Sequence, residues 1–80
     1  MAATRVALIS GGNRGIGLEI ARQLARNNIA VVIGARDFEK GHAAAHTIAS
    51  DGLAAEAVVL DVTDGNSVAK AVENVVRRHG

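Results

Sequence analysis

The fold of this chain is decided by residues 10–17, which read Ser10-Gly11-Gly12-Asn13-Arg14-Gly15-Ile16-Gly17. The stretch follows an apolar run at 5–9 that is typical of a strand buried on both faces. From Gly15 onward apolar residues recur at helical spacing until Asn27 and Asn28, where the tolerance of Asn for left-handed backbone predicts the helix end. Glycines let a backbone approach a phosphate closely, and a helix start offers free N–H groups and a positive dipole end. The stretch therefore predicts an anion-binding turn between a strand and a helix; a flexible glycine-rich turn is the alternative.

The alternation of strand and helix patterns continues through the rest of the chain. Further strands are expected at 29–35 and 57–60, and further helices at 38–49 and from an N-cap at Thr63 onward. This order is typical of a parallel sheet with right-handed crossovers. We expect one α/β unit over residues 1–80, a Rossmann-type βαβαβα half-domain whose three-stranded parallel sheet, in the order 3-2-1, is flanked by helices.

In this strand order the first strand lies at an edge of the sheet, with no further strand expected beside it. An exposed apolar strand edge can pair with a second chain. We therefore expect a homo-oligomer, or self-pairing, through the edge of the first strand.

The composition argues against several classes of protein. Nine basic and eight acidic residues give a formal net charge of +1, which provides no electrostatic footprint for nucleic acid or for a membrane surface. The chain has no cysteine, so neither a disulfide framework nor a thiolate metal site can form. No apolar run approaches the ~20 residues of a membrane span. Strand-like sequence from Arg5 leaves no room for a secretory signal, which predicts a cytoplasmic location.

Two competing motifs fail on closer inspection. Gly12 and Gly17 have the separation found in phosphate-loop NTPases, but the next residue is Leu18, where that chemistry requires Lys. His42 and His46 have a helical spacing that can bind zinc, but only alanines lie between them, so the glutamate of the zinc-protease pattern is absent. We interpret the two histidines as solvated helix residues and expect no metal site.

The glycine spacing is Gly-x-x-x-Gly-x-Gly, and with it the chain resembles the short-chain dehydrogenase/reductase family. Residues 6–17 look like the family's fingerprint, with Ser10 where Thr is usual, and Asp61-Val62 looks like its second signature. The resemblance covers essentially the whole chain and implies that residues 1–80 are the N-terminal, dinucleotide-binding half of such a protein. It implies adenine contacts for Asp61 and Val62, and a place at the pyrophosphate for Ser10, Gly11, Asn13, Arg14, Gly15, Ile16 and Gly17.

The end of the second strand predicts which cofactor is preferred. An acidic residue there would accept hydrogen bonds from the ribose 2′-hydroxyl of NAD and repel a 2′-phosphate. The resemblance places the neutral Ala35 there, followed by Arg36, whose guanidinium can form a forked contact with the extra phosphate of NADP(H). In members that prefer NADP, the position of Arg14 lies on the same side. Asp37 could pair with Arg36 or repel the phosphate. A site for the methyl donor S-adenosylmethionine usually requires an acidic residue after the second strand, so Ala35 and Arg36 disfavour that alternative.

Two of these assignments have a simpler alternative. Arg36 could be an ordinary surface arginine, and Asp61 could simply end a strand near the Thr63 cap.

Catalysis in the family requires residues that this sequence lacks. The resemblance implies hydride transfer between a nicotinamide and a carbonyl or alcohol, with a tyrosine as general acid or base beside a lysine. The chain contains no tyrosine, so Lys40 and Lys70 have no such partner, and we predict no catalytic residue and no activity for the 80 residues alone. The alternative interpretation is a non-catalytic, truncated Rossmann module with a nucleotide-binding or structural role.

Overall fold

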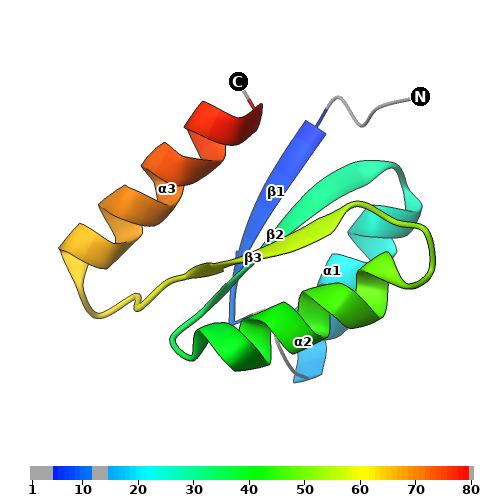
Figure 1. The fold of residues 1–80 in the computed structure, drawn as a ribbon, viewed down its shortest axis with the longest axis horizontal. Helices are drawn as coiled ribbons and strands as arrows, with labels where there is room; N and C mark the ends of the chain where they lie inside the picture. Colours follow the sequence, from blue (N-terminus) through cyan, green and yellow to red (C-terminus); the bar gives the residue numbers. More distant parts are fainter. Residues whose placement is uncertain (1–4, 12–14, 80) are drawn as a thin grey trace.

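Three strands alternate with three helices in the computed structural model of the protein, which describes residues 5–11 and 15–79 (Figure 1). The elements in chain order are β1 (Arg5–Ser10), α1 (Gly15–Arg26), β2 (Ile29–Ala35), α2 (Phe38–Ala49), β3 (Ala55–Val59) and α3 (Gly65–His79). The expected βαβαβα order is confirmed. Among the described residues, no helix has both the length and the hydropathy needed to cross a bilayer.

The strands form one parallel sheet in the order β1-β2-β3, as expected. The β1–β2 register runs from Arg5 opposite Ile29 to Ser10 opposite Gly34. β2 is the central strand and its residues from Val31 to Ala35 are all buried, which explains why its sequence is an unbroken apolar run. Because the strands are parallel, all three carboxyl ends lie at one edge of the sheet.

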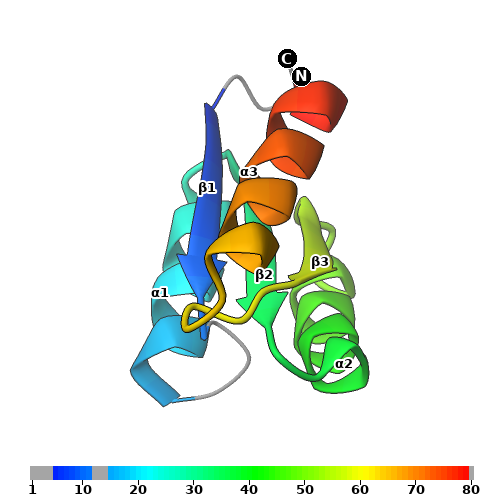
Figure 2. The ribbon, with the colours of Figure 1, turned by 90° about the vertical axis from the view of Figure 1, so that its left-hand side faces the viewer.

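Helices cover both faces of the sheet. α1 and α2 lie on one face and α3 lies on the other, as Figures 1 and 2 show from two directions. Alternate residues of β2 point to opposite faces. One cluster on the α1–α2 side contains Ala21, Ala25, Val31, Ile33, Ala44, Ala45 and Ile48. The smaller cluster on the α3 side contains Val32, Val58, Leu60 and Ala71.

Two turn residues behave as their types predict. Asn28 has a φ of 64°, so the left-handed end expected after the first helix is confirmed. The carboxylate of Asp37 caps α2 by accepting hydrogen bonds from the backbone N–H groups of Glu39 (3.0 Å) and Lys40 (3.4 Å). Asp37 is therefore the N-cap of α2.

Two expected boundaries are wrong. β3 spans Ala55–Val59 rather than 57–60, because pairing with β2 begins where Ala55 lies opposite Val31, before the apolar run starts. The N-cap of the last helix is not Thr63. α3 begins at Gly65, and the Asp64 carboxylate accepts a hydrogen bond from the backbone N–H of the second helical residue at 3.0 Å. Thr63 lies one residue too early to cap a helix that begins at Gly65, and its hydroxyl donates a hydrogen bond to Asp61.

Candidate functional site

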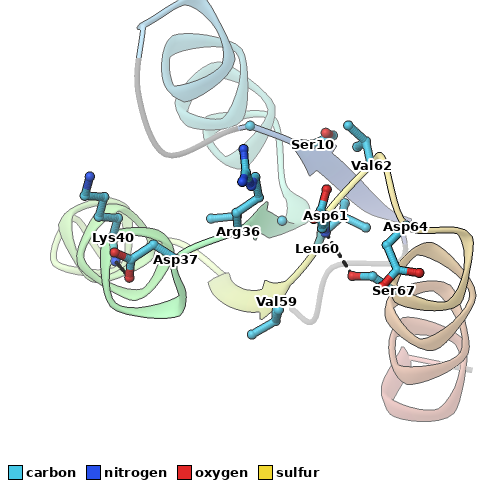
Figure 3. A pocket seen from close by; sticks show the side chains of 13 residues that line it. Ser10, Arg36, Asp37, Lys40, Val59, Leu60, Asp61, Val62, Asp64 and Ser67 are labelled. Carbon is cyan, nitrogen blue, oxygen red and sulfur yellow. Dashed lines mark hydrogen bonds between the residues drawn. The ribbon is translucent and has the colours of Figure 1, made fainter.

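A cleft of about 800 Å³ opens at the edge of the sheet where the three strands end (Figure 3). In open α/β sheets the crevice outside the carboxyl ends of the strands is the usual place for a ligand. Each strand end and the starts of α2 and α3 contribute to the lining, which consists of Ser10, Gly11, Gly34, Ala35, Arg36, Asp37, Lys40, Val59, Leu60, Asp61, Val62, Asp64 and Ser67.

The residue that follows β1 has a left-handed backbone conformation. Gly11 has a φ of +67° and donates its backbone N–H to the Gly34 carbonyl at 2.8 Å, so it leaves the sheet in a conformation that favours glycine. Gly15, the first residue of α1, has a φ of +61°. A Cβ atom added at either glycine would meet no atom within 4 Å, so the backbone faces open space.

The end of β2 contributes positive charge to the cleft. The exposed Arg36 side chain extends from the end of the strand toward the same side of the cleft as the Asp61 carboxylate (Figure 3). Lys40, in the first turn of α2, also lines the cleft and was missed by the sequence reasoning. Its position in the first turn of the helix expected directly after Arg36 was the available signal.

The end of β3 contributes a charged acceptor. Oδ1 of Asp61 accepts hydrogen bonds from the backbone N–H of Thr63 (3.0 Å) and from its hydroxyl (2.7 Å). The Thr63 hydroxyl and then its N–H lower the pKa of the Asp61 carboxyl below the usual value; partial desolvation opposes this effect, and the charge of Arg36 adds to it. The carboxylate is therefore ionised at neutral pH. The neighbouring Val62 is 61% exposed in the cleft wall.

The close contact between Gly34 and Leu60 fixes where the chain leaves β3. A Cβ atom added at Gly34 would lie 2.5 Å from Cδ2 and 2.9 Å from Cβ of the buried Leu60. The Leu60 N–H also donates to the Ala35 carbonyl at 2.9 Å, so this segment has little freedom to move away. The absence of a side chain at Gly34 thus allows the Leu60–Asp61 segment to lie close to the end of β2, and the hydrogen bond to Ala35 holds it there.

A Gly34→Ala substitution is expected to destabilise the protein by about 1–3 kcal/mol, because the added methyl overpacks the contact with Leu60. Thermal or urea unfolding of the purified variant measures the change. Gly65→Ala is the matched control, since a Cβ atom there meets nothing within 4 Å. Equal stability of the two variants would contradict the proposed close contact.

The structure brings five of the predicted site residues into one cleft: Ser10, Gly11, Arg36, Asp61 and Val62. Gly15, Ile16 and Gly17 form the first turn of α1, outside the cleft lining, and Ile16 is 80% exposed. Asn13 and Arg14 lie outside the described residues. The roles of all these residues in binding stay predictions.

The lining groups suit binding more than bond-making. The lining carries two cations, Arg36 and Lys40, and three carboxylates, of which Asp37 and Asp64 cap the helices that follow them. The cations and the backbone at Gly11 can hold the anionic groups of a ligand, and the third carboxylate, Asp61, can accept from a hydrogen-bond donor. The tyrosine that the family resemblance would require for proton transfer does not occur in the chain.

Comparison with known proteins gives a consistent result. Residues 5–80 match the family model described as short chain dehydrogenase. The chain is similar to carbonyl reductase (NADPH) 3 of Homo sapiens, with 42% identity over 76 residues that cover 94% of this chain and 27% of that protein. It is also similar to salutaridine reductase of Papaver somniferum, with 40% identity over 78 residues that cover 94% of this chain and 24% of that protein.

Solved structures give the same result for the fold. A metagenomic short-chain oxidoreductase in complex with NADP superposes with a TM-score of 0.90 at 35% identity, covering 99% of this chain and 36% of that chain. A variant of actinorhodin polyketide ketoreductase with NADPH superposes with a TM-score of 0.92 at 34% identity, covering 100% of this chain and 31% of that chain. The chain spans only 24% to 30% of the length of the curated relatives that it matches.

Proposed function

The chain belongs to the short-chain dehydrogenase family, and on this premise we propose that its cleft binds NADP(H). The observation that carries the proposal is the charge at the end of β2. The position where NAD-binding folds place an acidic residue is the neutral Ala35 here, and the cation Arg36 follows it into the cleft. The NADP and NADPH present in the similar solved structures support the same choice.

The described residues fit the parts of such a ligand. The open glycine backbone at Gly11 and Gly15, with the N-terminus of α1, would face the pyrophosphate. Arg36 would contact the 2′-phosphate through a charge-assisted, forked hydrogen bond. Asp61 would accept a hydrogen bond from the adenine amino group, beside Val62.

Hydride transfer between a nicotinamide and a carbonyl or alcohol is the activity we propose for a protein that contains this chain. The bound cofactor supplies the hydride or accepts it. The residues of this chain bind and orient the cofactor through its phosphates and its adenine. These 80 residues include no tyrosine, so the general acid or base that exchanges a proton with the carbonyl or alcohol must be a residue outside them.

A non-catalytic role is the second candidate, and the free edge of β1 favours it. In the described sheet β1 pairs with β2 alone, which leaves its other edge available to a second copy of the chain. Sedimentation of the purified protein tests this role. A monomer over the concentrations tested would contradict pairing through this edge.

A fluorescence titration of the purified protein with NADPH and with NADH tests the principal proposal. We expect saturable binding of NADPH at least tenfold tighter than binding of NADH, a difference of about 1.4 kcal/mol. Adenosine 2′,5′-bisphosphate, which carries only the phosphorylated adenosine half, should compete with NADPH. Equal affinity for the two dinucleotides, or saturation by neither, would contradict an NADP(H) site.

A further inference from the structure

The corner that carries Asp61 and Val62 lies beyond the end of β3, so the sheet ladder does not hold it. Its backbone is fixed by hydrogen bonds from outside the ladder. The Leu60 N–H donates to the Ala35 carbonyl at 2.9 Å, and the Asp64 N–H donates to the Asp61 carbonyl at 3.0 Å. These two bonds flank the Asp61 amide without satisfying it.

A side chain from α3 satisfies the Asp61 amide. Its N–H donates to Oγ of Ser67 at 2.9 Å in a part-buried hydrogen bond that Figure 3 marks. Ser67 is the third residue of α3, and Ala71, one turn later, is 3% exposed where the helix packs on the sheet. The hydroxyl therefore links the corner to a helix that is itself anchored in the core.

The carboxylate of Asp61 is also oriented by two hydrogen bonds from Thr63, two residues later in the chain. Both Thr63 hydrogen bonds end on Oδ1, and neither uses Oδ2. The direction in which Oδ2 points into the cleft then depends on the backbone position of Asp61. Ser67 holds that position.

We propose that Ser67 is a positioning residue for base recognition: by accepting the Asp61 N–H, its hydroxyl holds the Asp61 carboxylate where it accepts from the amino group of a bound adenine. This inference rests on the proposed binding of NADP(H). A fixed carboxylate favours adenine over hypoxanthine, because hypoxanthine has a carbonyl oxygen in place of the amino group and would face the carboxylate with a second acceptor. Loosening the corner should reduce this discrimination.

The test compares the affinities of NADPH and its hypoxanthine analogue for the purified protein and its variants. In Ser67→Ala the preference for adenine should fall roughly fivefold, the effect of one lost hydrogen bond. Ser67→Thr keeps the hydroxyl and should retain the preference. Ser50→Ala is the matched control, since the Ser50 hydroxyl donates to the His46 carbonyl on the exposed end of α2. Ser67→Cys, with a similar volume and a weak acceptor, gives the same readout if the alanine variant does not fold.

The outcomes separate this inference from the proposed function. A Ser67→Ala variant that weakens both ligands by the same factor would show a purely structural role and overturn the inference, while the NADP(H) proposal stands. If the unmodified protein binds NADPH no better than NADH, or binds neither, the proposed function fails and the inference falls with it. A reduced base preference in Ser67→Ala, with normal preference in Ser67→Thr and Ser50→Ala, supports the inference.

Discussion

An Arg36→Asp substitution is expected to weaken NADPH binding at least tenfold, or about 1.4 kcal/mol, while NADH binding holds or improves. The guanidinium stands at the end of β2, on the same side of the cleft as Asp61 (Figure 3). Its replacement removes the cation that would contact the 2′-phosphate. The new carboxylate would repel that phosphate and could accept hydrogen bonds from the 2′-hydroxyl of NADH.

Titrations with the two dinucleotides at one ionic strength measure this change. Arg5→Asp is the matched control, because it makes the same change of charge at the start of β1, the opposite edge of the sheet from the cleft. The control should bind NADPH nearly as well as the unmodified protein. Equal losses for NADPH and NADH in Arg36→Asp would refute the contact with the 2′-phosphate.

The second large effect concerns stability. Ile33→Ala is expected to lower the free energy of unfolding by about 2–5 kcal/mol, because it removes a fully buried side chain and leaves a cavity. Ile33 lies in the central strand with 0% exposure, and it packs in the cluster between the sheet and the α1–α2 layer. Domains of this size have little stability to spare, so such a loss should be a large part of the total.

Urea unfolding monitored by circular dichroism measures the loss. Ile20→Ala, the same chemical change at a residue of α1 that is 47% exposed, is the control and should cost clearly less. If the two variants unfold at the same urea concentration, the assignment of Ile33 to the centre of the core is wrong.

Local pattern was sufficient for most of the fold. The alternating strand and helix patterns predict the βαβαβα order, and Asn28 predicts the left-handed end after α1; the structure confirms both. The apolar run at 5–9 predicts a strand buried on both faces, but β1 is only partly buried because it lies at the edge of the sheet. Local pattern failed where two adjacent residues are both typical N-caps. Thr63 and Asp64 both suit the position by type, but α3 begins at Gly65, so Asp64 is the cap.

The sequence by itself determined the order of elements, the glycine directly after β1 and the cation after β2, because each depends on residues within one helical turn or one strand. Only the tertiary structure decided which side chains share the cleft. Lys40 and Ser67 are 27 residues apart in number, and no local rule relates them. Strand pairing and the packing of α3 bring them to one edge, because burial of the two apolar clusters fixes where each strand ends and each helix begins.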